Sequence, residues 1–438
     1  MVDGLYSEKN GIPTITITTT EFYGLVKSVA LGRGAADISY VAFPHPTGMI
    51  PLDEINAKTE KMFPEILKQA VGWVPKTQMA ATKPAYPAER IKFKGTAQEV
   101  SRMMFNRGWS MGLPVLPPTT DRVAEMLKGT SMKPGDVIGI VPPRMGVLTV
   151  EEAATACAMA DCKPEYMPVL IAALKGVLHT EFNLGGVMTT TGTTAIGIFV
   201  NGPIVKEIGL AYGQGSAGKG HHANAAIGYA MNSILYTIGG SKPPSTDKGT
   251  LSDPSDFTGW VFGENEDAAP KGWTTLAEDK GFKRTDNVVT VMGTYPPVEN
   301  IDHFSVTAQE HLEWWSHLVS PYTSFTNPQW PVTLEASGPV FAIGPEHASL
   351  IAKAGITKEQ WKKMLWEKLR VPLSTYPKEC SPAPLEKAWG RKLGPNDLIP
   401  IVDSPDMISI VIAGGSGKHS HYFPAFPGVK TISTLVQK

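Results

Sequence analysis

The first 75 residues alternate two hydrophobic patterns, which together predict a strand–helix–strand–helix order. Residues 12–20 are β-branched and alternating, and residues 38–43 form a second such run, so we expect a strand at each. We expect helices over 21–31 and 55–71. This order is typical of a parallel α/β unit. Two strands make an incomplete sheet, so we predict that another element completes it.

A proline-rich linker over 75–95 separates this fragment from a longer series of similar patterns. The predicted fold class is α/β, with a small parallel fragment over 1–74 and a larger α/β domain over 96–438. Residues 241–272 are expected to be rich in loops. Helices are expected over 98–107, 120–127, 150–159, 163–178, 225–238, 308–319 and 357–369, and strands over 137–141, 187–200, 288–292 and 407–412.

The larger domain carries a weak internal repeat. The run Asn201-Gly202-Pro203-Ile204 is similar to residues 337–340, and a further Gly-Pro pair follows at Gly344-Pro345. Each copy combines a strand, a Gly-Pro turn and a helix, and Pro345 suits a first helical turn. A duplicated strand–turn–helix fold would bring equivalent loops together at one cleft, and a chance similarity without duplication is the alternative.

The composition argues against several classes of function. The 438-residue chain has a net charge of −1, which does not favour nucleic acid or an anionic membrane as a partner. No apolar run approaches the roughly 20 residues that a membrane span needs, and no signal peptide is recognisable. Three cysteines are too few for a disulfide framework, so we expect a cytoplasmic protein. The low charged fraction, 18%, is typical of a chain that buries surface in an oligomer.

A glycine-rich stretch over 213–224 precedes the helix expected over 225–238. Such a turn can aim backbone N–H groups at an anion or an oxyanion, and a purely structural turn is the alternative. The spacing matches a dinucleotide fingerprint, but no predicted strand ends directly before Gly213 and no acidic residue follows at the expected distance. Gly220 replaces the hydroxyl residue of a phosphate-binding loop. The stretch predicts one proton-transfer residue, His221, and the substrate-binding residues Gly215, Gly218, Lys219, His222 and Asn224.

A second glycine-rich loop follows the last predicted strand. Lys418 could neutralise a carboxylate there and His419 could move a proton, while a metal bound by His419, His421 and His222 stays an alternative. The short acidic run 264–266 is expected to be a solvated loop. The remaining predicted substrate-binding residues are Asn201, Gly202, Gly415, Gly417 and Lys418.

Cys162 is the thiol with the strongest sequence signal for reactivity. It stands directly before Lys163 and Pro164, and a cysteine at a helix N-terminus has its thiolate favoured by the helix dipole. Glu165 opposes that effect and could itself act in catalysis. A buried small residue is the alternative for Cys162, as it is for Cys157. Cys380 lies in a proline-rich stretch and is expected to be inert.

Two motifs in the N-terminal fragment carry a family resemblance. The sequences Gly11-Ile12-Pro13-Thr14 and Ala42-Phe43-Pro44-His45-Pro46-Thr47-Gly48 resemble the UGSC-motif (seleno)protein family and the selenoprotein component B of glycine, sarcosine and betaine reductases. In these relatives a reactive selenocysteine or cysteine lies upstream of the Gly-Ile-Pro-Thr strand. This chain has no cysteine there. The resemblance therefore implies a second subunit that completes the sheet and presents a cysteine near His45.

Several segments between about residues 100 and 425 also resemble long bacterial proteins associated with the UGSC family. The resemblance implies a subunit of a hetero-oligomeric enzyme, of a lyase, hydrolase or reductase-like class. It would cleave or add at a carbon–heteroatom bond of a small, carboxylate-bearing substrate, with a thiol from Cys162 or from the partner as nucleophile. A non-catalytic pocket-forming subunit and a metal-dependent hydrolase or lyase stay as alternatives. The sequence identifies no cofactor.

Overall fold

The computed structural model describes residues 2–35, 38–48, 50–73, 88–326, 338–376 and 382–437. Cys380 and most of the predicted linker lie outside these ranges. Within them, no helix combines the length and the apolar character that crossing a membrane requires.

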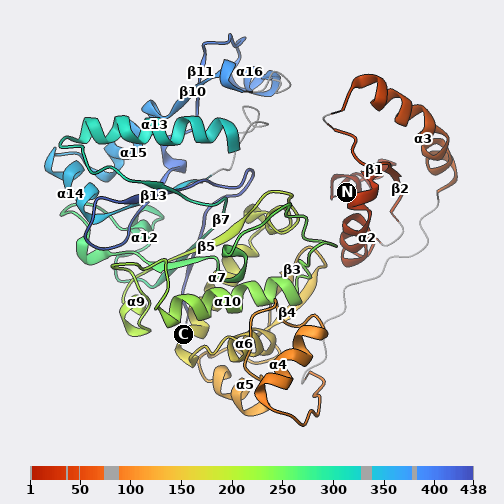
Figure 1. Ribbon diagram of the computed structural model, residues 1–438, viewed down its shortest axis with the longest axis horizontal. Helices are drawn as coiled ribbons and strands as arrows, with labels where there is room; N and C mark the ends of the chain where they lie inside the picture. The colour runs from red at the N-terminus through yellow and green to blue at the C-terminus, as the bar shows by residue number, and fades with distance from the viewer. Residues whose placement is uncertain are drawn as a thin grey trace.

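The N-terminal segment, residues 2–73, forms a small parallel α/β unit (Figure 1). Strands β1 (Thr16–Thr19) and β2 (Tyr40–Phe43) pair in parallel. Helix α2 (Tyr23–Gly32) follows the first strand and α3 (Leu52–Gly72) follows the second. The predicted order is confirmed. The first strand is shorter than expected, and a helix that was not expected, α1 (Val2–Lys9), precedes it.

The body, residues 88–437, contains two four-stranded sheets with the same strand order. The first sheet runs β14-β7-β5-β6 and the second runs β8-β13-β9-β12. In each sheet the last two strands are parallel and the other neighbours are antiparallel. The first sheet comprises β5 (Ala195–Asn201), β6 (Trp260–Gly263), β7 (Val288–Thr294) and β14 (Ile432–Leu435), and the second comprises β8 (Val298–Asn300), β9 (Val340–Ile343), β12 (Ser409–Ile412) and β13 (Ser420–Phe423).

The two sheets lie between two layers of helices (Figure 1). Because side chains alternate along a strand, Ile198 of β5 packs against the first helical layer, whereas Phe199 points between the sheets. There it meets Phe262 and Phe423, with ring centroids 4.9 and 5.7 Å away. The first layer contains α6 (Val150–Met159), α7 (Met167–Val177) and α10 (His222–Thr237), and the second contains α13 (Ala308–Thr326), α14 (Pro345–Lys353) and α15 (Lys358–Lys368).

The two halves of the body exchange their fourth strands. Strand β8 comes directly after β7 in the chain but pairs with β13 of the second sheet. Strand β14 comes after β13 but pairs with β7 of the first sheet. This reciprocal pattern supports an internal duplication. The residue correspondence expected from the sequence was wrong, because Ile204 begins a helix whereas Val340 begins a strand; the matching Gly-Pro turns are Gly202-Pro203 after β5 and Gly344-Pro345 after β9.

Local sequence signals set the ends of many elements. Thr357 caps α15, because its hydroxyl accepts from Gln360 N (3.1 Å) while the Gln360 side chain accepts from Thr357 N (2.8 Å). The helix expected from residue 163 begins only at Met167, after a 3₁₀ turn over Pro164–Tyr166. Other elements are α4 (Ala97–Asn106), α5 (Thr120–Leu127), β3 (Val137–Val141), β4 (Gly146–Thr149), α8 (Leu184–Val187), α9 (Ile204–Glu207), α11 (Ser255–Thr258), α12 (Leu276–Asp279), β10 (Arg370–Pro372), α16 (Ala383–Trp389) and β11 (Leu398–Pro400).

Candidate functional site

The two glycine-rich loops meet at the carboxyl ends of the parallel strands, which is the arrangement that a duplicated fold would give. The first loop, residues 213–220, precedes α10, and the second, residues 414–418, follows β12. Gly414 N donates to Tyr212 O (3.1 Å). A side chain at Gly415 would collide with Gln214 of the first loop. Gly415 therefore permits the close approach of the two loops.

A buried carboxylate, Glu264, joins the two sheets near these loops. It accepts hydrogen bonds from Asn201 Nδ2 (2.6 Å), Leu276 N (2.7 Å) and Ile412 N (3.1 Å). Burial raises the pKa of Glu264, while the charge of Lys358 and these hydrogen bonds oppose the rise. The expected solvated loop was wrong for this residue, because its hydrogen-bond donors come from both sheets and enclose it.

Asn201 and Gly202, predicted to bind substrate, belong to the same buried network. Asn201 Nδ2 and Gly202 N both donate to Glu266 Oε1, at 3.0 and 2.9 Å. Gly202 has a φ of 92°, and a side chain there would meet the Asp286 carbonyl, so the position requires glycine. Asn201 Oδ1 is buried and has no hydrogen-bond partner in the described parts of the chain. These contacts give both residues a structural task at the junction of the sheets.

The first glycine loop uses several of its polar groups internally. Gly218 N donates to Gly215 O (2.8 Å), so this amide already has a partner. Asn224 is buried in α10, and its Nδ2 donates to three carbonyls, of which that of Ser216 (3.0 Å) belongs to the loop. Asn224 therefore anchors the loop. Lys219 is exposed and free to meet a ligand from solvent.

Cys162 lies in the core, directly before Lys163, the N-cap of the 3₁₀ turn that leads into α7. Its side chain is 5% exposed, and no helix begins until Pro164. Its thiol is hydrogen bonded to that of Cys157, and this bond together with burial raises the pKa of Cys157 well above its usual value. Pro164 does occupy the first turn, as predicted, but the thiol of Cys162 is buried and not open to solvent. A buried thiol of this kind is typical of a small core residue.

Two further predicted site residues, Glu165 and His222, are exposed at the surface. Glu165 is exposed and lines a hollow of about 640 Å³. His222, at the first turn of α10, contacts Tyr166 Oη through Nδ1 (3.3 Å) and Asp161 Oδ2 through Nε2 (3.5 Å). Both ring nitrogens of His222 are therefore occupied, and His221 is half-buried at the helix cap.

Lys418 and His419 extend from the second loop toward the chain that follows β8. Lys418 Nζ donates to the carbonyls of His303 (3.2 Å) and Ser305 (3.3 Å). The Nδ1 atom of His419 is 2.6 Å from Glu299 Oε1. Gly417 N, predicted to bind substrate, donates to a glutamate side chain, that of Glu346 (2.8 Å). The second loop is thus tied to the protein at three points.

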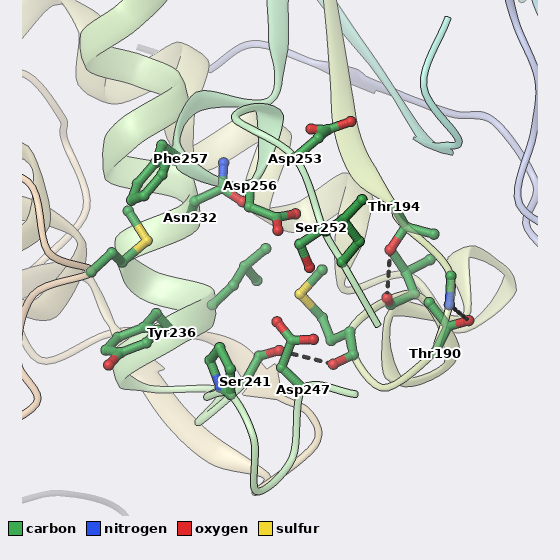
Figure 2. A pocket seen from close by; sticks show the side chains of 17 residues that line it. Thr190, Thr194, Asn232, Tyr236, Ser241, Asp247, Ser252, Asp253, Asp256 and Phe257 are labelled. Atoms are coloured by element: carbon green, nitrogen blue, oxygen red, sulfur yellow. Dashed lines mark hydrogen bonds between the residues drawn. The ribbon is translucent and has the colours of Figure 1, made fainter. Parts of the chain in front are cut away.

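The structure also contains an acidic cavity that sequence analysis missed. It measures about 340 Å³ and lies at the amino ends of β5 and β6, the end of the first sheet opposite the glycine loops. Figure 2 shows the side chains of Asp247, Ser252 and Asp256 pointing toward the same space. Other polar residues on the wall are Thr190, Thr194, Asn232, Tyr236, Ser241 and Asp253.

Asp256 is the carboxyl group in this cavity with a strongly shifted pKa. Burial raises the pKa of Asp256 to about 6; the hydrogen bond with Ser252 opposes this, and the charges of Asp247 and Asp253 add to it. Asp253 is itself held in place, because its Oδ1 accepts hydrogen bonds from the amide and the hydroxyl of Ser255. The cavity thus contains a group that can hold or release a proton near neutral pH.

Lys248 connects the rim of this cavity to the N-terminal segment. Its neighbour Asp247 lines the cavity, while Lys248 Nζ donates to Glu21 O (2.6 Å) and lies 5.6 Å from the centre of the Phe22 ring. The Phe22 ring centroid is in turn 6.0 Å from that of His45, which follows β2. His45, one of the residues that carried the family resemblance, is therefore linked to the cavity rim through Phe22 and Lys248.

The cavity was missed because its carboxylates come from a region with no hydrophobic periodicity. Asp247, Asp253 and Asp256 all fall within the stretch expected only to be loop-rich. Their close spacing, with Ser252 and Ser255 between them, was the available signal. Polar residues from α10 complete the site, and their direction depends on how that helix packs.

A second cluster has the residue types of a metal site, namely Asp302, His311 and His347. The ring nitrogens of its two histidines are, however, already engaged in hydrogen bonds. All three side chains are buried, and their potential ligand atoms lie within 4.8 Å of one another. Trp315 Nε1 donates to His311 Nε2 (3.0 Å), so the ring hydrogen must be on Nδ1, which is 2.6 Å from Asp302 Oδ2. The neutral His311 ring then has no lone pair for a metal.

The electrostatics of this cluster agree with a structural network. Burial, followed by the charge of His347, lowers the pKa of His311 to about 4. Burial raises the pKa of Asp302, but hydrogen bonds from Ser305 and His311 outweigh it and lower that pKa to about 2. The ring of His347 is occupied at both nitrogens, by Ser420 Oγ (2.7 Å) and Asp302 O (3.0 Å).

Comparison with known proteins identifies one part of the chain. Residues 1–72 match the model of the UGSC family, which confirms the resemblance of the N-terminal segment to that family. No curated protein and no solved structure matches the chain. The similarity to component B of the reductases stays a prediction.

Proposed function

We propose that the chain is an enzyme subunit whose acidic cavity holds a small polar substrate and whose Asp256 transfers protons. The observation that carries this proposal is a carboxyl with a pKa of about 6 facing a cavity of about 340 Å³. Cavities of this size accommodate small ligands, and an acid–base group works best when its pKa lies near the working pH. Protonation of a leaving atom would serve cleavage at a carbon–heteroatom bond, the reaction class that the family resemblance implies.

The charge of the cavity favours a substrate with an amine or neutral polar groups. Asp247, Asp253 and Asp256 all line it, so a carboxylate placed there would be repelled. This proposal differs from the carboxylate-bearing substrate expected from the sequence. A substrate with both groups would place its amine in the cavity and keep its carboxylate outside.

A second subunit completes the N-terminal segment in this proposal. Helix α3 has no buried residue, and Phe63, Leu67 and Val71 form an apolar stripe at four-residue spacing that is 52, 48 and 86% exposed. Within the described ranges, the β1–β2 sheet consists of two strands. An α/β partner that adds strands to this sheet and covers α3 would satisfy both features. Such a partner would present the family's reactive cysteine near His45, close to the cavity rim.

Turnover of small metabolites tests the assignment of the cavity. The wild-type chain, alone and co-expressed with the neighbouring gene product, is incubated with a cell extract that is followed by mass spectrometry. We expect a substrate to be consumed by the wild type, and at least about 100-fold more slowly by Asp256→Asn, because general acid–base catalysis contributes roughly 10²–10⁴-fold. Asp121→Asn, which changes an exposed carboxylate on α5, is the matched control.

Three outcomes separate the possibilities. Equal turnover by Asp256→Asn and the wild type would remove Asp256 from the chemistry. Turnover only in the presence of the second gene product would support the partner. Amine binding without turnover, detected as thermal stabilisation by ethanolamine that Asp256→Asn loses, would support a non-catalytic pocket-forming subunit instead.

A further inference from the structure

The wall of the acidic cavity is divided between carboxylates and hydrocarbon. Its apolar side chains come from α8, α10, α11 and the loops beside them, and include Met111, Val187, Met188, Leu235, Leu251 and Phe257. In Figure 2, Phe257 lies across the space from Thr194, with Asp256 between them. A wall of this composition gains free energy when a hydrocarbon group of a ligand replaces water against it.

The apolar side of the cavity is held in place by the cores of the body. Leu235 is 1% exposed and belongs to the core of the first helical layer, against which Met188 also packs. Met111 and Phe257 pack against a smaller cluster that includes Tyr229. A ligand would therefore meet an apolar surface that is already formed, which lowers the entropic cost of binding.

Asp247 is the carboxylate best placed to receive an ammonium group. Its Oδ1 accepts a hydrogen bond from Gly249 N (2.9 Å), whereas its Oδ2 has no hydrogen-bond partner in the parts of the chain that the structure describes. Its side chain points into the cavity (Figure 2). The charge of Asp247 adds to the rise in the pKa of Asp256, so the two carboxyl groups lie near each other. An ammonium group on Asp247 would offset this repulsion.

The two lysines that flank this stretch leave the negative charge of the cavity in place. Lys248 Nζ donates to the carbonyls of Glu21 (2.6 Å) and Pro244 (2.8 Å). Lys242 Nζ donates to Gly108 O. Within the described ranges, neither lysine forms an ion pair with a carboxylate of the cavity. A cation from solvent therefore has carboxylates to pair with.

The rim of the cavity adds a further apolar contact. Leu251 lines the cavity although its side chain is 89% exposed. Thr250 N donates to Thr191 O (3.0 Å), which ties the backbone beside Leu251 to the opposite wall. A ligand whose apolar part reaches the rim would remove Leu251 from water.

We propose that the cavity selects a primary amine that carries a short hydrocarbon chain. Asp247 binds the ammonium group, and the chain lies against Leu235, Met188 and Phe257. The volume of about 340 Å³ is at the lower end of those that hold small ligands, so the chain is a few carbons long. This inference rests on the proposed function, because it takes the acidic cavity as the substrate site, and it adds the class of substrate and the residues that select it.

A homologous series of ligands tests the proposal. The full chain is titrated at pH 7.5 with methylamine, propylamine and pentylamine by isothermal titration calorimetry. We expect the affinity to rise about fourfold for each added CH₂ group that reaches the apolar wall. Uncharged 1-pentanol and anionic pentanoate, which have the same chain length, should bind at least about 10-fold more weakly than pentylamine.

Substitutions separate the two sides of the cavity. Asp247→Asn should reduce the affinity for pentylamine to that for 1-pentanol, whereas Asp121→Asn should bind as the wild type does. Phe257→Ala should reduce the gain per CH₂ group. Leu251→Ser changes an exposed position that is not needed for folding and should weaken pentylamine binding at least about twofold. Leu398→Ser, at a leucine of β11 that is 51% exposed, is its matched control.

The outcomes distinguish this inference from the proposed function. Equal affinity for methylamine and pentylamine, equal affinity for pentylamine and 1-pentanol, or no binding of pentylamine by the wild type would overturn the inference. Loss of turnover in Asp256→Asn would still support the proposed function in each of these cases. Conversely, a rise in affinity along the series with unchanged turnover in Asp256→Asn would support the inference and remove Asp256 from the chemistry.

Discussion

The N-terminal segment and the body differ in how much apolar surface each buries within itself. The segment has two strands and a small buried cluster formed by Leu5, Ala30 and Ile38, whereas the body buries its apolar side chains in three large clusters between four layers. The family match covers the segment, and the acidic cavity is in the body. The comparison teaches that the part with a family match buries little apolar surface of its own, while the body has the extensive core.

Truncation gives the largest expected difference between the two regions. Ending the chain after Thr431 removes β14, exposes the edge of β7 and uncovers α7, so we expect loss of the folded state. Removing residues 1–73 should leave a folded body, because the two regions meet mainly through α2 and the loop near Lys248. Circular dichroism and gel filtration provide the measurement.

A chain that ends after Val436 keeps β14 and controls for the loss of the terminus itself. Normal folding of the chain that ends at Thr431 would contradict the need for β14. Unfolding of the body after removal of residues 1–73 would contradict its independence from the N-terminal segment.

Paired phenylalanine substitutions give an intermediate effect. Phe199 is fully buried between the sheets, so Phe199→Ala should lower the free energy of unfolding by about 3–5 kcal/mol in urea titrations. Phe63 on α3 is 52% exposed, so Phe63→Ala should change the stability of the isolated chain by less than about 0.5 kcal/mol. If the partner proposal is right, Phe63→Ala should instead weaken the complex. A large loss of stability in the isolated Phe63→Ala chain would show that α3 is already covered.

The smallest expected effect is a pH-dependent change in stability at Asp256. The pKa of Asp256 is about 6 in the folded protein, against an ordinary value of 3.8. The folded state therefore holds this proton more tightly than the unfolded state, and stability falls as the pH rises from about 4 to 6. Asp256→Asn removes the charge, so its melting temperature should exceed that of the wild type at pH 8 but not at pH 3.5.

Thermal melts at the two pH values provide the measurement, and Asp121→Asn should show no such gain. A lower melting temperature for Asp256→Asn at pH 8 would mean that the ionised carboxylate stabilises the fold.

The sequence predicted the bounds of helices and strands correctly where a local signal marks them. The predicted bounds of α5, β3 and α6 are those observed, because a capping threonine or a β-branched run marks each. The sequence did not predict the burial of side chains that is determined by tertiary packing. Cys162 is buried because it packs into the core of the body, and Glu264 is enclosed by donors that include Ile412 N, 148 residues away in the chain.

The candidate site shows the same division. The sequence motifs predicted the glycine loops and His419 as site elements. The hydrogen-bond partners of His419 come from the stretch after β7, where no sequence motif indicated a site. The acidic cavity needs α10 and two loops to converge on it. Neither convergence follows from the order of residues along the chain.

The exchange of β8 and β14 bears on the order in which this protein can fold during synthesis. The first sheet contains β5, β6 and β7 well before its fourth strand, Ile432–Leu435, leaves the ribosome. Until then the edge of β7 is open, and the contacts that close it span more than 130 residues of chain. Such long-range pairing slows folding and leaves nascent intermediates prone to aggregation. The first sheet of the body is therefore completed only after Ile432–Leu435 has been translated, and until then we expect chaperones that cover open strand edges to assist its folding.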